Sequence, residues 1–580
     1  MPIAAPAVTA ARPLHWSVLL LGGVFAVPLL WSLLASVDAG TDARAWAALA
    51  AQAETAPALW MSTCTGVAAT ALAWSGCALL LSLFSHSGPW ERLLRPLPAM
   101  LAMPHAAFAV GFVLLMAPAG WVMRGGVALL APFNSLLGLA LDAPPPWPTT
   151  QDPWGMGLIA VLALKEIPFL LWSAAAQLQQ PDLARRLTQE LQVAQSLGYH
   201  PHSAWWRVVW PQLVGRLRAP LLAVLVFNLT VVDVAILTGP TTPPTLSVLA
   251  WQWLQDADAG RNAMGAAAAW ALAGLALGIA MAGAMVRHGA RRWRVRRQTR
   301  GVPLPLPRSD ATSLRKIGQC CAPWGWQGAQ SWGTAAVAAV LPAAYGAVAL
   351  ALALGSVIGV WPFPALWPQD WTWQAWQAVV ASAALVGTTL ALGLGSAGAA
   401  LLWTVAWLEC APAQWQRRTQ NLWYLPLLVP VVLWALGLHR LTLDWGLHAS
   451  ASGMWLAHTL CVLPYVLLSL QGAYGGFDAR LQNAAASLGH SRWAFVWRVK
   501  WPLLRAALCA SFAVGFAVSV AQYLPTLYVG AGRFTTVTTE AVALASGGAR
   551  SLLAAFAALL CLLPALVFGW AAWLGRPRQF

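Results

Sequence analysis

Long apolar runs separated by short polar segments dominate the chain. A helix that crosses a bilayer needs about 20 mostly apolar residues, and the pattern predicts two sets of such spans. The first set lies near 14–37, 58–85, 96–118, 156–178, 217–239 and 263–286. The second set lies near 335–361, 377–408, 420–438, 453–472, 504–530 and 551–574. The sequence therefore predicts an all-α polytopic membrane protein with about twelve transmembrane helices.

Two segments need separate treatment. The run from Leu14 to Val37 is too long for a signal-peptide core, and no small-residue cleavage site follows, so we expect a retained first span. Segment 119–154 contains the apolar stretch GGVALLAPFNSLLGLALD, which Pro132 interrupts and a triple proline follows. Because proline breaks helical hydrogen bonding, we expect a membrane-proximal loop or a re-entrant helix there, and a thirteenth span is the alternative.

Composition and charge support a membrane protein. The 580 residues are 59% hydrophobic and only 9% charged, with a mean hydropathy of +0.63. A soluble protein of this length could not bury so much apolar surface. The formal charge of +16 would also fit a nucleic-acid partner. With both termini in the cytoplasm, however, most basic residues fall on the cytoplasmic side, as in bacterial inner-membrane proteins. We therefore expect the lipid bilayer as partner and no nucleic acid.

A basic linker divides the chain. It covers about 287–334, begins with RHGARRWRVRR, and then loses helical character in a stretch of alternating proline and leucine. It is either a positively charged joint or a segment that binds anionic lipid. The predicted units are an N-terminal region with the first span (1–56), a first domain (57–286), the linker (287–334), the seventh span with an outer loop (335–375), a second domain (376–574) and a cytoplasmic tail (575–580).

Metal-binding and disulfide patterns are weak. The eight cysteines show no CxxC spacing, and Cys320 and Cys321 are adjacent in the linker. His200 and His202 lie close together without a third ligand nearby. We expect neither a disulfide framework nor a metal site.

An internal repeat relates the two halves. When Gly198 is placed over Gly489, an offset of 291, ten of the twenty positions in 194–213 are identical. This pattern indicates a tandem duplication or fusion of one six-span unit. An even number of spans gives both copies the same orientation, so both repeated loops face the cytoplasm.

The repeated segment predicts a helix–glycine–helix element. LTQELQVAQSL and ARLQNAAASL contain good helix formers and end at Gly198 and Gly489, since glycine adopts the left-handed conformation that closes a helix. A short second helix with tryptophan and arginine follows, including Arg207 and Arg498. Pro211 and Pro502 then stand where a new helix can begin. Such an amphipathic element can lie on the membrane interface or fit a partner's groove.

This segment resembles the EAA loop of ABC-importer permeases, which docks into a cleft of the ATPase subunit. The family pattern is EAA-x3-G, followed by about a dozen residues and a proline. The matching segments are QVAQSLG at 192–198 and NAAASLG at 483–489. The glutamate is replaced in both copies. The resemblance assigns ATPase coupling to Gln192, Ala194, Gly198, Arg207, Pro211, Asn483, Ala484, Ala485, Gly489, Arg498 and Pro502.

The resemblance covers most of the chain and implies a function. Two permease units in one polypeptide are similar to fused permeases for thiamine, ferric iron and related small solutes. The segments at 163–172 and 521–548 look like a thiamine-type branch of that group. This implies the type I ABC importer fold with two homologous six-helix halves, and alternating access driven by two copies of an ABC ATPase that use ATP and Mg. It also implies an outside solute-binding protein and no cofactor bound by this chain, in which we find no GxxxxGK[ST] motif.

Four polar residues inside predicted spans are candidates for a solute path. Lys165 and Glu166 lie in the fourth span, where charge is expensive. As helix neighbours they do not face each other, so each should have its own partner. They form either a substrate or gating site or a structural ion pair within the bundle, or they lie near the membrane interface. Asp233 and Gln522 hold broadly similar places in the fifth and eleventh spans, and either line the path or are satisfied polar groups.

Two other function classes would require features of which the sequence offers few or none. An ion-gradient-driven secondary transporter would have discontinuous helices and paired carboxylates at mid-membrane. The sequence offers few such carboxylates, and this alternative leaves the repeated loop unexplained. A membrane-embedded enzyme would need a cluster of catalytic residues, which we do not find.

Overall fold

The computed structural model describes residues 14–85, 90–133, 143–144, 150–199, 201–299, 326–547 and 549–576. Nine described helices are long and apolar enough to cross a membrane. Three further helix pairs bend by 64°, 102° and 72° at short breaks, and counting each pair as one span gives twelve. The prediction of an all-helical chain with about twelve spans is therefore confirmed, although three of the predicted spans are bent pairs.

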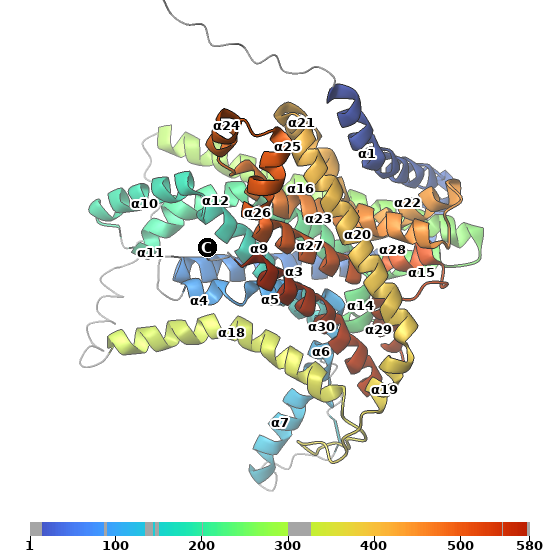
Figure 1. Cartoon of the computed structure of the whole chain (residues 1–580). Helices are drawn as coiled ribbons and strands as arrows, with labels where there is room; N and C mark the ends of the chain where they lie inside the picture. Colours follow the sequence, from blue (N-terminus) through green and yellow to red (C-terminus); the bar gives the residue numbers. More distant parts are fainter. Residues whose placement is uncertain are drawn as a thin grey trace, which may run out of the picture.

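Figure 1 shows the arrangement of the helices. In the first half the elements that make up the predicted spans are α1 (Leu14–Ala39), α3 (Thr55–Phe84), α5 (Leu97–Ala102), α6 (His105–Met116), α9 (Met156–Leu178), α13 (Arg218–Thr230), α14 (Asp233–Thr238) and α16 (Ala259–Thr299). Further helices connect them: α2 (Ala43–Ala51), α4 (Trp90–Leu94), α7 (Trp121–Leu130), α10 (Pro181–Ser196), α11 (Pro201–Ala204), α12 (Trp210–Arg216) and α15 (Leu246–Leu254).

The second half repeats much of this order. The elements of its spans are α18 (Trp326–Gly355), α20 (Ala383–Cys410), α21 (Ala413–Trp423), α22 (Val431–Asp444), α23 (Ala451–Gly475), α27 (Arg505–Val520), α28 (Leu524–Gly530) and α30 (Arg550–Gly575). Its connecting helices are α19 (Gln374–Ala381), α24 (Ala479–Ser487), α25 (Arg492–Phe495), α26 (Trp501–Leu503) and α29 (Val537–Leu544). Helices α15 and α29, each of which precedes the last span of its half, were not predicted.

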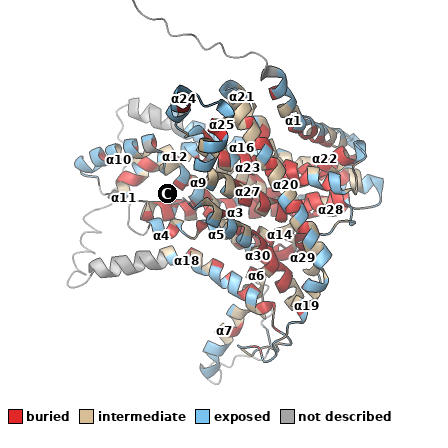
Figure 2. Cartoon of the chain, viewed as in Figure 1, coloured by how far each residue is buried: buried red, intermediate tan, exposed pale blue. Residues whose placement is uncertain are grey.

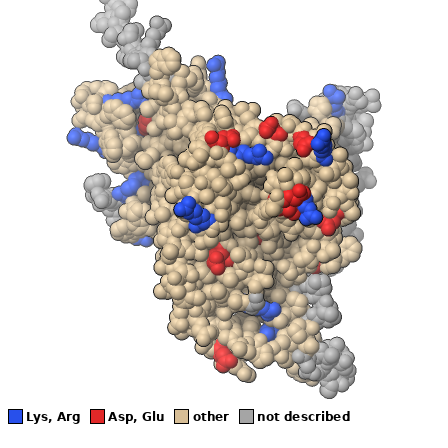
Figure 3. All heavy atoms as spheres, turned by 90° about the vertical axis from the view of Figure 1, so that its right-hand side faces the viewer, with Lys and Arg blue, Asp and Glu red and all other residues tan. Residues whose placement is uncertain are grey.

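Burial separates central from peripheral helices. Most of α9 and α23 is buried, 67% and 72% of their apolar windows, whereas α1 is buried over only 33%. Figure 2 shows the buried residues gathered around α9, α23, α27 and α30. The face in Figure 3 is largely uncharged, with scattered acidic and basic side chains. Apolar side chains are exposed on the outer helices, as a bilayer requires of the lipid-facing surface.

The first helix of each half packs against the other half. Helix α1 lies along α22 and α20, and α18 lies along α6 as well as α30 (Figure 1). Two glycines permit this close approach: a methyl group added at Gly437 would lie 2.3 Å from the Ser32 carbonyl oxygen, and one at Gly111 would lie 2.9 Å from that of Val348. Each glycine stands seven residues after a proline that precedes its helix. The predicted units 1–56 and 335–375 thus contain the two exchanged helices.

Helices continue into both ends of the predicted linker 287–334. Helix α16 continues to Thr299, and α18 already begins at Trp326, so both ends of the predicted linker 287–334 are helical. Arginine and alanine, which are good helix formers, outnumber weak formers such as Gly289 in the basic cluster, and α16 continues through it. Residues 300–325, with Cys320 and Cys321, lie outside the described residues, as do His200, most of 134–149 and the tail beyond residue 576. In segment 119–154 the structure places α7, which follows directly on α6.

Candidate functional site

The two repeated loops have the same helix-ending geometry. Gly198 after α10 and Gly489 after α24 have φ angles of +87° and +81°, so both are left-handed. The N–H of Tyr199 donates to the Ala194 carbonyl at 3.1 Å, and the N–H of His490 donates to that of Ala485 at 3.0 Å. A bond of this kind from the residue after the glycine satisfies a carbonyl that the helix end would leave free. The left-handed glycines expected from the sequence are present in both copies.

A π-helical turn follows in each loop and was not predicted. It covers Trp205–Val209 in the first loop and Val496–Lys500 in the second. Pro211 and Pro502 are each the second residue of the helix that follows, as expected. A proline ring crowds the carbonyl four residues earlier and offers no N–H, and a widened turn relieves both effects. Sequence reasoning anticipated the helix start but not the wider turn that precedes it.

Burial divides the residues assigned to ATPase coupling. Ala194 and Ala485 are buried against the loops, whereas Gln192, Asn483 and Ala484 are exposed. The side chains that replace the family's glutamate therefore face outward, where an amide can still form hydrogen bonds with a partner. The guanidinium of Arg207 lies 4.9 Å from the centre of the Tyr199 ring. Arg498 is exposed.

A groove accompanies the first loop. It has a volume of about 540 Å³ and is lined by residues of α10, the π-helical turn and α12. Its apolar lining is Val193, Ala194, Leu197, Tyr199, Val208 and Pro211, with Glu190, Arg207 and two glutamines at its polar positions. The Glu190 carboxylate accepts a hydrogen bond from Gln212 at 2.6 Å, which joins α10 to α12. This polar contact thus fixes the position of α10 relative to α12, the two helices that form the groove.

Lys165 stabilises a break in a neighbouring span. Helix α5 ends at Ala102 and α6 begins after Pro104. Because proline has no N–H, the Met100 carbonyl, four residues earlier, lacks its helical donor. The Lys165 ammonium donates to the carbonyls of Met100 at 3.1 Å and Met103 at 2.6 Å. A cation at the carbonyl end of α5 is also favoured by the helix dipole.

Glu166 binds the other side of the same break. Its carboxylate lies 3.1 Å from Nε2 of His105, the first residue of α6. Adjacent residues of α9 therefore hold the two helix ends on either side of Pro104, and each has its own partner, as their spacing indicated.

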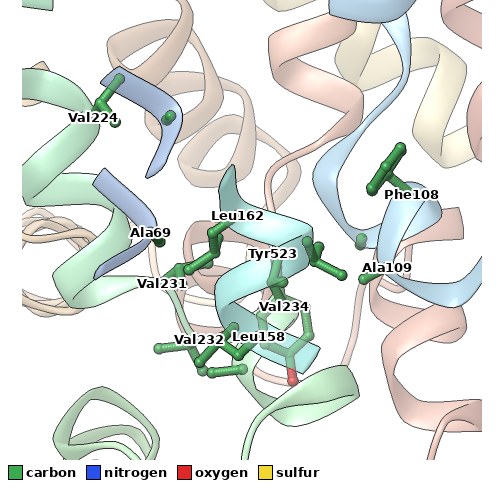
Figure 4. Packing of buried hydrophobic residues seen from close by; sticks show 14 of the residues in the cluster. Ala69, Phe108, Ala109, Leu158, Leu162, Val224, Val231, Val232, Val234 and Tyr523 are labelled. Carbon is green, nitrogen blue, oxygen red and sulfur yellow. The ribbon is translucent and has the colours of Figure 1, made fainter. Parts of the chain in front are cut away.

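Asp233 and Gln522 both lie where a span is broken. Asp233 is the first residue of α14, after the break that follows α13, and Gln522 lies between α27 and α28. Both side chains are half-buried. Figure 4 shows Tyr523, next to Gln522, packed among Leu158 of α9 and Val234 of α14, so the second-half break meets the first half there. The similar placement of the two polar residues noted in the sequence holds in space.

Matched polar contacts support the two breaks. The Ser247 hydroxyl donates to the Val231 carbonyl at 2.8 Å, and the Thr538 hydroxyl donates to the Val520 carbonyl. Ser247 and Thr538 are again 291 residues apart. In the second half His458 of α23 also spans the break, with hydrogen bonds to the hydroxyls of Ser519 and Thr526. These residues escaped sequence analysis because lone hydroxyls in apolar segments carry no recognisable pattern.

No metal centre emerges among the described residues, since no three His, Cys, Asp or Glu side chains there come together as ligands would. The described cysteines are free thiols.

Comparison with known proteins adds independent evidence. No protein-family model matches the chain. The inner membrane ABC transporter permease protein YnjC of Escherichia coli is 35% identical to it over 581 residues, which cover 98% of this chain and 99% of that protein. A probable molybdenum ABC transporter permease protein of Haloferax volcanii is 32% identical over 111 residues, 18% of this chain and 41% of that protein.

Proposed function

This chain belongs to the family of inner-membrane ABC transporter permeases, and from that premise we propose that it is the two-unit permease of an ATP-driven importer. It is a multi-pass membrane component rather than an enzyme. Family membership removes the support for an ion-gradient-driven secondary transporter. The remaining questions are how ATP hydrolysis elsewhere reaches the bundle and what the bundle carries.

We infer that the two repeated loops are the docking sites for two ATPase subunits, which use ATP and Mg. The observation that carries this proposal is the matched geometry of the loops: a left-handed glycine, a π-helical turn and a second-position proline in each copy. Among the described residues both loops expose apolar side chains, which include Leu197 at 72% and Leu488 at 76% exposure. Both loops lie away from α7 in Figure 1, in accord with a common cytoplasmic side.

The matched breaks support a fusion of two permease units. The hydroxyl contacts at Val231 and Val520 recur at nearly the same spacing as the loops, and the exchange of α1 and α18 ties each unit to the other. We propose the unit boundaries 57–286 and 376–574, with both termini in the cytoplasm. Alternating access then follows if movement of the loops shifts the bent spans against each other.

We propose that the bundle carries a small solute. The sequence resemblance favours a thiamine-like solute or ferric iron delivered by an outside binding protein. Asp233 and Gln522 stand at the two breaks and are the best placed residues for a solute path. Lys165 and Glu166 already hold the α5–α6 break, so we assign them a supporting role in the position of the path.

Glycine variants test the docking. The permease is purified by affinity from its native membrane, and the stoichiometry of any bound ATPase is measured by quantitative mass spectrometry. In the variant G198V/G489V a β-branched side chain must adopt a left-handed φ, which costs roughly 1–2 kcal/mol per position. We expect the ATPase to be lost.

The matched control is G198N/G489N. Asparagine tolerates the left-handed region far better, so this variant should retain the ATPase although it also adds side chains at both positions. Among the described residues other than its two chain neighbours, no atom lies within 4 Å of a methyl group added at either glycine. A difference between the two variants would therefore reflect the backbone conformation rather than a steric clash. Full ATPase association in the valine variant would contradict docking through these loops.

A further inference from the structure

We propose that Glu409 and Lys500 form the joint through which the second loop moves span α20, and that the first loop is attached to its span by a neutral contact instead. This inference rests on the proposed docking of ATPase subunits to the loops. It assigns a positioning role to two residues outside the repeated family pattern.

The ion pair is short and largely buried. Lys500 is the last residue of the π-helical turn, and its ammonium lies 2.7 Å from the Glu409 carboxylate in the last turn of α20. Only 15% of the Lys500 side chain and 6% of the Glu409 side chain are exposed. The ammonium also lies 4.4 Å from the centre of the Tyr474 ring at the end of α23. Buried charges of this kind depend strongly on each other, because a partner left alone would be desolvated without compensation.

A second cation strengthens the attachment. Arg492, the first residue of α25, donates a hydrogen bond to the main-chain carbonyl of Glu409. The last four carbonyls of a helix lack internal donors, and positive charge is favoured at that end. Both ends of the short element between Arg492 and Lys500 are therefore bound to one helix terminus. A small cavity of about 170 Å³ beside them is also lined by Gln482 of α24.

The joint connects to the centre of the second half. Helix α20 packs along α23 and α27, and a methyl group added at Gly393 of α20 would lie 2.7 Å from the Phe516 ring of α27. Contact this close leaves little freedom for α20 to move alone. A displacement of the second loop is therefore passed to the helix that ends at the α27–α28 break.

The first half is built differently at the same place. Position 209, which corresponds to Lys500 at the offset of 291, is a buried valine. The loop contacts the end of α3 through the Trp205 indole, which donates to the Ser85 hydroxyl at 2.9 Å. A neutral hydrogen bond contributes less than a buried ion pair loses when one partner is removed. The two loops are thus alike as docking surfaces and unlike in their attachment.

Spin-label distance measurements test the joint on the full chain bound to its co-purifying ATPase, with native cysteines replaced by alanine. One label pair, T188C/R480C, reports on helices α10 and α24 of the two loops, and a second, L72C/L402C, reports on spans α3 and α20. All four positions are exposed, and none is assigned to ATPase docking. Distances are measured without nucleotide and after trapping with ATP and vanadate. The test variant is E409Q/K500M, which removes both charges and so leaves no orphaned ion.

We expect trapping to change both distances in the parent protein. In E409Q/K500M the loop distance should still change, whereas the span distance should stay at its nucleotide-free value. The control W205F removes the neutral first-half contact and should retain both changes.

Three results would overturn the joint. They are a normal span response in E409Q/K500M, an equal loss of that response in W205F, and loss of ATPase from E409Q/K500M, which would make the pair a docking contact. Failure of the parent protein to bind any ATPase would instead refute the proposed function itself.

Discussion

Replacement of Lys165 by methionine should destabilise the first half although it removes a charge from the apolar bundle. Methionine keeps much of the volume of the lysine stem but leaves the carbonyls of Met100 and Met103 without their donor. A buried acceptor that loses its donor costs roughly 1–3 kcal/mol. Two such acceptors, less the desolvation of the ammonium that is recovered, give a net loss of about 2–3 kcal/mol.

The measurement is equilibrium unfolding of the purified permease in mixed micelles, followed by tryptophan fluorescence. A double-mutant cycle with P104A isolates the cause. Alanine at position 104 supplies an N–H that can donate to the Met100 carbonyl, so lysine is needed less in that background. The coupling between the two substitutions should be at least about 1 kcal/mol.

Two outcomes would refute this account of Lys165. One is a K165M variant as stable as the parent, which would mean that the ammonium only offsets its own desolvation. The other is additive effects of K165M and P104A, which would separate the lysine from the proline break. The variant K165Q serves as an internal standard, since a neutral amide can still donate to both carbonyls and should recover part of the loss.

Two further predictions concern the exchanged helix and the outer face. G437A should lower the free energy of unfolding by about 1–3 kcal/mol, because its methyl group would overlap the Ser32 carbonyl. The control G398A has open space around the added methyl group and should be neutral or stabilising in the same unfolding assay. Equal effects of the two substitutions would contradict the close approach of α1 and α22. R124M should speed proteolysis of the segment 356–373, because the buried Arg124 guanidinium donates to three carbonyls there; an unchanged cleavage rate would show that other contacts hold the segment.

Hydropathy located the spans well where a helix is straight. The predicted span 156–178 coincides with α9, and the repeated loop was found from identities alone. The break after α13 was missed because Val231 and Val232 continue an apolar run, and the donor to the Val231 carbonyl is the hydroxyl of Ser247 in a later helix. A hydrogen-bond partner of this kind depends on tertiary packing, which the local hydropathy pattern does not reveal.

The packing of α1 and α18 against the opposite halves could also not be predicted from the 291-residue spacing of the repeated loops. Gly111 and Gly437, which accommodate those helices, are related by a spacing of 326 rather than 291, because the connecting segments of the two halves differ in length. The repeat that links them is a proline seven residues before each glycine. A search restricted to the offset of the loops would not align these positions, although the physical reason for each glycine is the same close helix contact.

The few charges of this chain mark the places where its two halves differ. In the first half a lysine and a glutamate of α9 hold the ends of α5 and α6, whereas in the second half a histidine of α23 holds its broken neighbour through neutral hydroxyls. At the loops the ionic contact is in the second half and the neutral one in the first. In each half a largely buried lysine lies at the carbonyl end of a helix, Lys165 at α5 and Lys500 at α20, where unpaired carbonyls and the helix dipole lower its cost. Removal of the charge at these helix ends should therefore have different effects in the two halves. In the first half it should lower the stability of the helix bundle, and in the second half it should weaken the response of span α20 to movement of the loop.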